Sequence, residues 1–275
     1  MNIRLIVTDL DGTLLNKSRQ ISPRTARALR ACQARGVKIM FASGRSFEAV
    51  RPFALGAELD ACRIVSCNGS RLDETPYGPV LFEDNLPEEL AREAAGRLVE
   101  AGLYTECYSD ERIYMANRVP LPTRHHRPGL TADGAVEFVE DAARLLAEGP
   151  KKARKLIVFT DNPANIEKAR ALLEGLPVSL SQSGGDNLEI MRKDAGKGRA
   201  VAWYAASRGI AKEEIMAFGD QTNDLDMLLA AGWPVAMENA VEDVKRCARL
   251  IAPHHAADGV ARILEQYVLE GGVNR

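Results

Sequence analysis

Residues 7–16 read VTDLDGTLLN, and the first of them, Val7, is the last residue of a largely apolar run at 3–7. The run predicts a buried β-strand that ends in two aspartates, Asp9 and Asp11. In a parallel α/β sheet, ligands bind beyond the carboxyl ends of the strands, where both aspartates would lie. Two neighbouring carboxylates repel each other unless a cation or a positive side chain offsets them. We therefore expect a hard cation such as Mg²⁺ here, although an ordinary turn is the alternative, because Asp and Gly are common turn residues.

Strand-like and helix-like segments alternate through both ends of the chain. A helix is expected over 22–36, with Ser22 as its N-cap, and a shorter one over 46–57, weakened by Pro52. Near-continuous apolar strands that alternate with helices indicate a parallel sheet covered on both faces, so the fold class is α/β with a Rossmann-like core. The strands expected in this core are 3–10, 37–45, 62–69, 214–220 and 248–253.

The middle of the chain has a periodicity of its own and enough residues for its own core. We interpret residues 84–191 as an inserted α+β module, and residues 1–83 and 192–275 as the two halves of the parallel-sheet core. A segment rich in proline and basic residues, 118–130, predicts an irregular loop. Inside the module we expect helices over 87–102, 135–149 and 162–175, and strands over 103–110, 112–117, 155–161 and 187–191.

Composition limits the function classes. The 275 residues are 46% hydrophobic and 27% charged, with a formal net charge of -2, which gives no argument for a nucleic-acid or anionic membrane partner. The five cysteines are odd in number and form no C-x-x-C pair, which argues against a disulfide framework or structural zinc. No signal peptide precedes the first strand and no apolar run is long enough to cross a bilayer, so we expect a cytoplasmic protein.

Two further polar signals stand where a phosphate could bind. Ser43 and Gly44 end the second strand in the sequence ASGR and place a hydroxyl and an accessible N–H before the next helix; the alternative is that Ser43 is only an N-cap. Lys197 lies between two glycines at a helix start, where its charge works against the helix dipole. Such a lysine needs a negative partner, for which phosphate is a natural candidate, although a solvated surface lysine is the alternative.

The fourth expected core strand, 214–220, runs into the sequence FGDQTNDLDML, residues 218–228. Asp220 and Asp224 are one helical turn apart, so both carboxylates can face one site, and Asn223 supplies an amide on the same side. Helix capping by these residues is the alternative. By periodicity Asp226 points elsewhere, and we interpret it as an ordinary charge at a helix start.

In chain order, these signals are a carboxylate pair, a serine, a lysine and a second carboxylate pair. With this order the chain resembles the haloacid dehalogenase-like superfamily, and within it the Cof-type phosphatases with a type IIB cap. The resemblance runs from end to end. The segments that carry it are DLDGTLL, FASGR, SCNG, LEIMRKDAGKGRAV, FGDQTNDLDML and AGWPVAMENA.

The resemblance implies a role for each site residue. Asp9 would attack phosphorus to form an aspartyl-phosphate, and Asp11 would protonate the leaving group and later activate water. Mg²⁺ would be held by Asp9, by the backbone carbonyl of Asp11 and by Asp220, with Asp224 supporting that shell. The phosphoryl oxygens would be bound by Leu10 through its backbone and by Ser43, Gly44, Lys197 and Asn223. The candidate substrate contacts are Asn68, Gly69 and Arg45.

The resemblance implies a Mg²⁺-dependent phosphatase that acts on small phosphorylated metabolites, with sugar phosphates as the first candidates. The inserted module would be its lid. A phosphomutase shares the aspartate pair and stays open as an alternative. A non-catalytic protein that binds phosphorylated ligands is a second alternative, disfavoured because it would not need both aspartates. The sequence leaves open the substrate, the choice between monomer and homodimer, and the roles of five polar residues: Gln221, His125, His126, His254 and His255.

Overall fold

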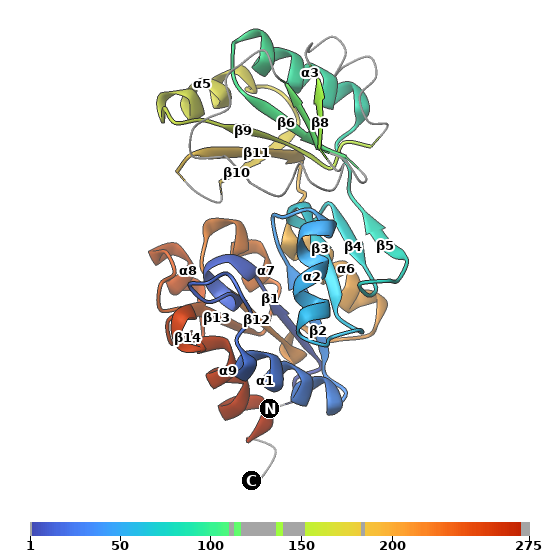
Figure 1. The fold of residues 1–275 in the computed structure, drawn as a ribbon, viewed down its shortest axis with the longest axis vertical. Coiled ribbons are helices and arrows are strands. Elements are labelled where there is room, and N and C mark those ends of the chain that lie inside the picture. Colours follow the sequence, from blue (N-terminus) through green and yellow to red (C-terminus); the bar gives the residue numbers. More distant parts are fainter. Residues whose placement is uncertain (1, 110–112, 117–135, 140–151, 183–184, 271–275) are drawn as a thin grey trace. The chain divides into compact units, whose positions relative to one another are not determined.

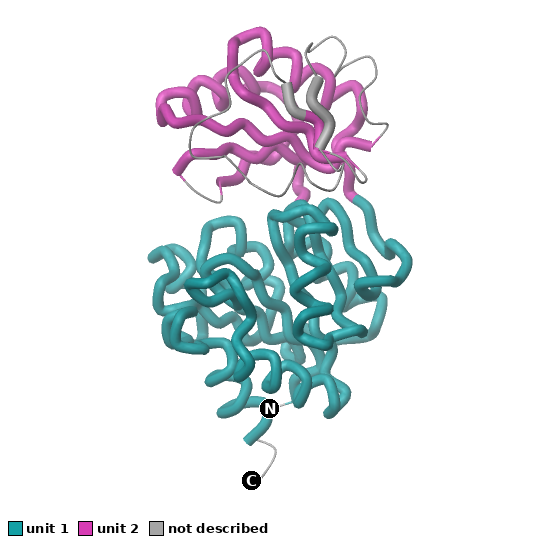
Figure 2. Tube along the Cα trace, in the orientation of Figure 1, with its two compact units in different colours: residues 1–83, 196–275 teal, residues 84–195 magenta. Residues whose placement is uncertain are grey.

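The computed structural model describes residues 2–109, 113–116, 136–139, 152–182 and 185–270. The chain divides into two compact units (Figure 2): unit 1, residues 1–83 with 196–275, and unit 2, residues 84–195. The second boundary lies a few residues beyond the expected 191/192. The expected loop at 118–130, which includes His125 and His126, lies outside the described residues.

Unit 1 is built on one eight-stranded sheet. Six strands run parallel from β14 to β3, and β4 and β5 complete the sheet as antiparallel strands at one edge. The parallel core agrees with the α/β expectation, whereas β13, β4 and β5 were not predicted. In sheet order the strands are β14 (Leu250–Ala252), β13 (Trp233–Met237), β12 (Ile215–Gly219), β1 (Leu5–Thr8), β2 (Lys38–Ala42), β3 (Arg63–Ser66), β4 (Arg71–Asp73) and β5 (Val80–Glu83).

Helices lie on both faces of this sheet. The order β1-β2-β3 advances one way from the first strand and β12-β13-β14 advances the other way, so right-handed crossovers place their helices on opposite faces. Figure 1 shows α1, α2 and α9 on the near face and α6 behind it. The helices of unit 1 are α1 (Pro23–Ala34), α2 (Phe47–Gly56), α6 (Lys197–Ser207), α7 (Leu225–Leu229), α8 (Glu242–Cys247) and α9 (Gly259–Leu264).

The first helix shows how local sequence sets these elements. The Ser22 side chain accepts a hydrogen bond of 3.1 Å from the Thr25 N–H, and Pro23 occupies the first helical position, as expected for an N-terminus. Ala28 and Leu29 are buried against the sheet. The helix ends before Gly36, which adopts a positive φ of 82°.

In its described residues, unit 2 is an α+β module with a six-stranded, mostly antiparallel sheet. Leu98, Leu156, Leu188 and Ile190 belong to its own buried core. The described elements, with the strands in sheet order, are β10 (Val178–Ser181), β11 (Asn187–Arg192), β9 (Lys155–Phe159), β6 (Thr105–Tyr108), β7 (Ile113–Ala116) and β8 (Val136–Val139), together with α3 (Glu88–Glu100) and α5 (Ala164–Leu172).

One expected helix of the module is wrong where it can be compared. Residues Val136–Val139 were predicted to open a helix, but they form β8, parallel to β7. Valine and phenylalanine favour strands, and the apolar positions of this short segment fit both the helical and the strand period. Its pairing with β7 therefore determines that it forms a strand. The rest of the expected helix, 140–149, lies outside the described residues.

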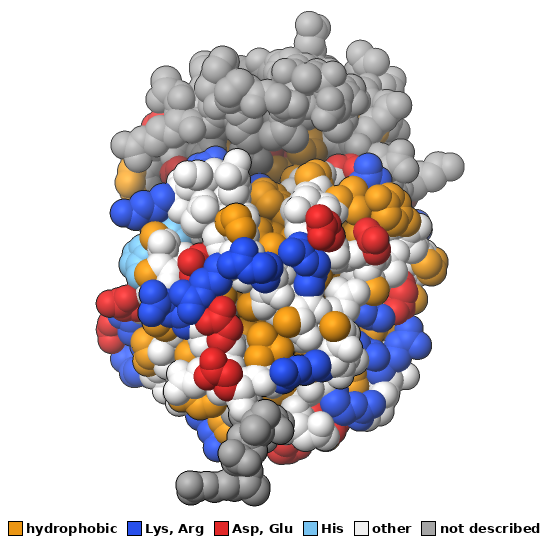
Figure 3. Space-filling model, turned by 60° about the horizontal axis from the view of Figure 1, so that its bottom comes forward, with side chains coloured by type: hydrophobic (Ala, Val, Ile, Leu, Met, Phe, Trp, Pro, Cys, Tyr) orange, Lys and Arg blue, Asp and Glu red, His pale blue; other side chains and the backbone are white. Residues whose placement is uncertain are grey.

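Across the face shown in Figure 3, basic and acidic side chains are interspersed with scattered apolar ones.

All five cysteines are among the described residues, and no disulfide joins them. Burial raises the pKa of the Cys62 and Cys107 thiols to about 12. In the described ranges, no helix is long and apolar enough to span a membrane.

Candidate active site

The site is built at the carboxyl ends of β1 and β12. These strands are parallel neighbours with Thr8 opposite Phe218, so the residues that follow them lie together. The Asp9 N–H donates to the Phe218 carbonyl at 3.0 Å, which continues the ladder by one residue and fixes the Asp9 backbone. Asp220 follows Gly219 at the end of β12. The aspartates expected at two distant points of the sequence thus belong to one site.

Three carboxylates surround one lysine in this site. Lys197 Nζ donates to Asp9 Oδ1 at 2.7 Å and to Asp224 Oδ1 at 2.6 Å, and its side chain is fully buried. Carboxylate oxygens of Asp9, Asp220 and Asp224 lie within 4.8 Å of one another, and all three residues are buried. The negative partner expected for Lys197 is therefore a pair of carboxylates. We call these four residues the acidic cluster.

Asp224 is held by the backbone as well as by the lysine. Residues Thr222–Asp224 form a single 3₁₀ turn after β12. Asp224 Oδ2 accepts hydrogen bonds from the N–H groups of Asp220 at 2.9 Å and Gln221 at 3.0 Å. The one-turn spacing thus brings both carboxylates to one place, as expected. Gln221 Nε2 lies 3.4 Å from Asp220 Oδ2, a long hydrogen bond at the edge of the cluster.

Burial shifts the protonation equilibria of the cluster. Desolvation raises the pKa of Asp9 well above its usual range, and Lys197 offsets this only in part because Asp224 and Asp220 add to the rise. Desolvation, with Asp224 as the second cause, raises the pKa of Asp220 to about 6. For Lys197, desolvation favours the neutral form, but Asp224 and Asp9 outweigh it and raise its pKa, so the ammonium stays charged. The cluster therefore stabilises the charged form of Lys197 and disfavours the simultaneous ionisation of Asp9 and Asp220.

Asp11 lies apart from the acidic cluster. After Asp9 the chain makes one wide turn, Leu10–Leu14, which the Leu15 N–H closes on the Leu10 carbonyl at 2.9 Å. The turn buries Leu10 and directs the Asp11 side chain outward, where 53% of it is exposed. Asp11 accepts two hydrogen bonds from Arg45, of 2.7 Å and 2.6 Å. Each aspartate of the opening motif thus has its own cation, Lys197 for Asp9 and Arg45 for Asp11.

The Leu10–Leu14 turn is held at two points, one of which lies on the acidic cluster. Thr13 Oγ1 donates to Asp220 Oδ1 at 2.9 Å. Asn239 Nδ2 donates to the Gly12 carbonyl at 2.8 Å. Asn239 belongs to the recognised segment AGWPVAMENA but had no expected role. Its contact with a residue more than two hundred positions away depends on the sheet order, which the local sequence does not reveal.

We expect Gly12→Ala to destabilise the fold more than Gly36→Ala. Both glycines have a positive φ, 80° and 82°, so the backbone penalty of a side chain is the same, about 1–2 kcal/mol. A Cβ on Gly12 would clash with Asp220 Oδ2, whereas one on Gly36 meets nothing within 4 Å. The contact should add about 1–3 kcal/mol, measured by urea unfolding. Equal losses in the two variants would show that Gly12 is needed only for its backbone conformation.

The phosphate-binding candidates Ser43 and Gly44 follow β2 beside the segment 67–69. The Ser43 carbonyl accepts from the Asn68 N–H at 3.0 Å, and Ser43 Oγ accepts from the Arg45 N–H at 3.2 Å. Helix α2 begins at Phe47 with Ser46 in the N-cap position, so Ser43 is not the N-cap of this helix. Ser43 is 2% exposed and lies at the strand end, as expected.

Segment 67–69 has an unusual backbone. Cys67 and Asn68 both have positive φ, 49° and 51°, and Gly69 follows with 98°. Left-handed conformations in consecutive non-glycine residues are costly and concentrate at functional sites. Asn68 Oδ1 accepts a hydrogen bond of 3.2 Å from Asn223 Nδ2. Two residues expected at the site, Asn68 and Asn223, are thus brought together, and Gly69 packs closely on the carbonyl of Gly196.

Asp226 lies in the first turn of α7 and outside the acidic cluster, as expected, but it also has a specific partner. It was interpreted as an ordinary charge at a helix start, but its Oδ2 accepts a hydrogen bond of 2.8 Å from the Gly198 N–H. Desolvation raises the pKa of its carboxyl. This contact joins α7 to the first turn of α6 and so fixes the helix that carries Lys197. Helical periodicity could not show this partner, because Gly198 lies on another helix.

The histidine pair near the C-terminus has a structural role. His255 Nδ1 lies 2.6 Å from the Leu15 carbonyl, directly after the Leu10–Leu14 turn. The His254 N–H donates to Glu238 Oε2 at 2.9 Å, and the His255 N–H donates to Asn239 Oδ1 at 3.2 Å. The pair thus connects the segment after β13 to the segment after β1.

The chain was compared with known proteins and structures. Residues 6–264 match the family of haloacid dehalogenase-like hydrolases. Pyridoxal phosphate phosphatase YbhA of Escherichia coli is 27% identical, over 98% of this chain and 100% of its own length. The phosphatase YwtE of Bacillus subtilis, named for 5-amino-6-(5-phospho-D-ribitylamino)uracil, is 26% identical over 96% of this chain and 98% of its own.

The fold has a close counterpart among solved structures. The subclass IIB sugar phosphatase BT4131 superposes with a TM-score of 0.82 at 22% identity, over 96% of this chain and 98% of that one. At this identity the likeness concerns the fold, which includes the α+β insertion. The family match covers both halves of the parallel-sheet core and the insertion between them. The chain therefore belongs to the haloacid dehalogenase-like hydrolases, and its resemblance to the Cof-type phosphatases of that family is confirmed.

Proposed function

We propose that the chain is a Mg²⁺-dependent phosphatase that hydrolyses small phosphorylated metabolites, with sugar phosphates as the leading class. The observation that carries the proposal is the acidic cluster, three buried carboxylates around one buried lysine at the ends of β1 and β12. Buried carboxylates at this density are costly unless they do chemistry or hold a cation. In a family of hydrolases, this cluster is the natural place for both.

The donor set of the cluster fits Mg²⁺. All its donors are oxygens, which this hard cation prefers, and they lie close enough to share one ion. Asp9, Asp220 and the backbone carbonyl of Asp11 would hold the ion. Both oxygens of Asp224 already accept hydrogen bonds from Lys197 and from two backbone N–H groups. Asp224 would therefore act by orienting Lys197 and the Asp220 backbone.

The reaction would proceed in two steps. A carboxylate oxygen of Asp9 forms a bond to phosphorus as the bond to the leaving oxygen breaks, and Asp11 gives its proton to that oxygen. Water then attacks phosphorus, its proton passes to Asp11, and the bond between Asp9 and phosphorus breaks to release phosphate. The bound metal would neutralise charge on the phosphoryl oxygens.

The remaining site residues would position the phosphoryl group. Lys197 Nζ touches the nucleophile Asp9, so the same ammonium can meet an equatorial oxygen during transfer. Ser43, Gly44 and the Leu10 backbone would supply hydrogen-bond donors. Asn223, held by Asn68 at 3.2 Å, would supply another. These groups bind phosphate but carry no information about the rest of the substrate.

Unit 2 would act as the lid that excludes water and selects the leaving group. The named substrates of the relatives differ, one a pyridoxal phosphate and one a ribitylaminouracil phosphate, although both share a phosphate on a small metabolite. The sugar phosphatase with the same fold supports sugar phosphates as the first class to assay. These comparisons support a class of substrate and leave its identity to a screen.

The proposal is tested by phosphate release. The purified chain should hydrolyse p-nitrophenyl phosphate and members of a sugar phosphate panel with MgCl₂, and should lose at least about 10²-fold in rate with excess EDTA. Restoring Mg²⁺ should restore the rate. Isomerisation of a hexose 1-phosphate without phosphate release would identify a phosphomutase. Ligand-induced thermal stabilisation with no turnover of any ester would contradict enzymatic function.

A further inference from the structure

The ion pair of Arg45 and Asp11 has no assigned role in the reaction. Arg45 Nε donates to Asp11 Oδ2 at 2.7 Å and its Nη2 donates to Asp11 Oδ1 at 2.6 Å. The two parallel bonds form a fork that fixes the plane of the carboxyl group as well as its position. A lysine in the same place would supply charge without this orientation.

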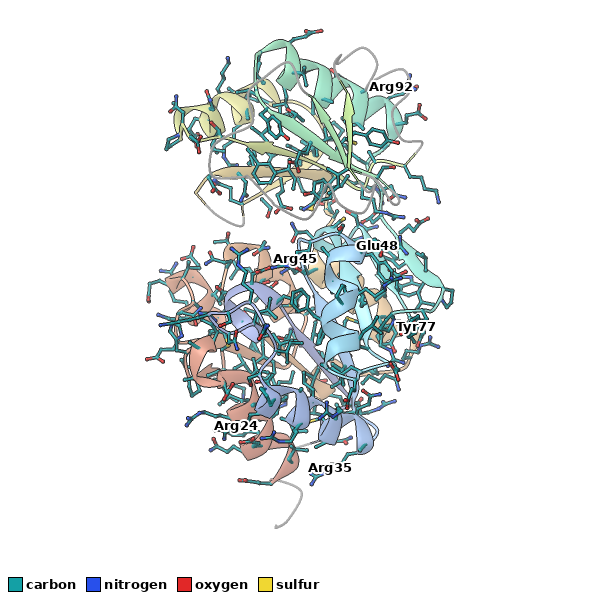
Figure 4. All side chains as sticks on the ribbon, in the orientation of Figure 1. Arg24, Arg35, Arg45, Glu48, Tyr77 and Arg92 are labelled. Atoms are coloured by element: carbon teal, nitrogen blue, oxygen red, sulfur yellow. The ribbon has the colours of Figure 1, made fainter. Side chains whose placement is uncertain are left out.

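The backbone and the guanidinium group of Arg45 are both held by neighbouring residues of the site. Its N–H donates to Ser43 Oγ at 3.2 Å, and its carbonyl accepts from the Cys67 N–H at 2.8 Å. Its guanidinium carbon lies 5.2 Å from the centre of the Phe53 ring, which comes from α2. Figure 4 shows Arg45 beside the start of α2. The backbone at the phosphate-binding candidates therefore sets where this side chain can reach.

Stability does not explain the pair. The side chains are 28% and 53% exposed, and ion pairs at such exposure contribute little to folding. The buried Lys197 is different, because its removal would leave Asp9 and Asp224 without their cation in the interior. The fork on Asp11 is thus better explained by the orientation that it imposes than by the energy that it supplies.

We propose that Arg45 is the positioning residue of Asp11. A guanidinium has only donors, so a proton carried by the Asp11 carboxyl has to point away from Arg45. The carbonyl oxygen of that carboxyl can still accept one N–H of the fork. In the first step the proton passes from Asp11 to the leaving oxygen while the electron pair of the breaking P–O bond goes to that oxygen. This inference rests on the proposed phosphatase function and adds a residue to it.

The leaving group provides a specific test. Departure of a basic alkoxide or phenoxide needs the proton of Asp11, whereas p-nitrophenoxide departs without it. Arg45→Met should therefore lower kcat/KM for phenyl phosphate at least about tenfold more than for p-nitrophenyl phosphate, since general acids contribute about 10²–10⁴-fold. Arg45→Lys should recover only part of the difference. The two esters have the same ring and differ mainly in leaving-group basicity.

Arg51→Met is the matched control. Arg51 lies on α2, as Arg45's neighbour Phe53 does. Its guanidinium lies 6.0 Å from the Phe47 ring and pairs with Glu48 at 3.7 Å, and neither of these contacts involves Asp11. It should change neither kcat/KM, and thermal unfolding should show that each variant is folded. An equal loss of kcat/KM on both esters would make Arg45 a phosphate-binding residue and overturn the inference. If the wild-type chain hydrolysed neither ester, the proposed function itself would fail, and the role of Arg45 with it.

Discussion

Asp9→Asn is expected to abolish turnover without unfolding the protein. The amide keeps the shape of the side chain, and its oxygen can still accept from Lys197, but it cannot form the acyl phosphate. We expect phosphate release to fall roughly 10⁴-fold or more. The substitution also removes one of three crowded carboxylates, so the free energy of unfolding should stay equal or rise.

The two readouts together make this test sharp. Phosphate release is measured with saturating Mg²⁺, and stability is measured by urea unfolding in EDTA. Asp60→Asn is the control, because Asp60 is an exposed aspartate outside the site. Undiminished turnover in Asp9→Asn would exclude the covalent mechanism. A large loss of stability would instead show that the carboxylate is needed for folding.

Lys197→Met should have the largest effect on stability. Methionine fills a similar volume, but it leaves Asp9 and Asp224 buried without their cation. Breaking such a buried pair costs about 3–5 kcal/mol at neutral pH. Turnover should also fall about 10²–10³-fold, because the ammonium would no longer meet the phosphoryl oxygens.

The pH dependence of this loss has a definite sign. The pKa of Lys197 is raised in the folded protein, so its contribution is fully present at and below neutral pH. The pKa of Asp9 is raised by burial, and removal of Lys197 raises it further. In the variant the native state then binds more protons than the unfolded state, so stability increases as pH falls from neutral toward the usual aspartate range.

Urea unfolding of metal-free protein at pH 7.5 and 5.5 checks this sign. The deficit of Lys197→Met relative to wild type should be smaller at pH 5.5. The double variant Lys197→Met, Asp224→Asn should recover part of the loss at pH 7.5 because it buries one charge fewer. An equal deficit at both pH values, with no recovery in the double variant, would show that packing and not charge accounts for the loss.

Much of the site follows from chain order. Parallel strands expose their carboxyl ends at one edge of a sheet, so polar residues that follow separate strands converge there. This argument needs no side-chain geometry, and it is why Asp9, Ser43 and Asp220 were placed correctly at strand ends. The argument could not be applied to β13, because that strand was not predicted. Pro234 lies within it, and a proline weakens a strand prediction.

The pairing of charges did not follow from the sequence. Lys197 was expected to need a negative partner, but which carboxylates would meet it depends on how α6 docks on the sheet. Arg45 was considered only as a substrate contact, because nothing local connects it with Asp11, thirty-four positions earlier. The partner of Asp226 was missed for the same reason, since Gly198 lies on another helix. Such pairs are tertiary facts, and periodicity describes only one element at a time.

The acidic cluster also has a consequence for how the site can change over generations. With all groups ionised, three buried carboxylates and one buried ammonium carry two negative charges, which one divalent cation would balance. Loss of Lys197 alone would break this balance, whereas a second substitution that removes one of the carboxylates would restore part of it. We therefore expect the position of Lys197 to change only after, or together with, one of its carboxylate partners. Loss of Asp9 alone would leave the fold intact and remove only the reaction.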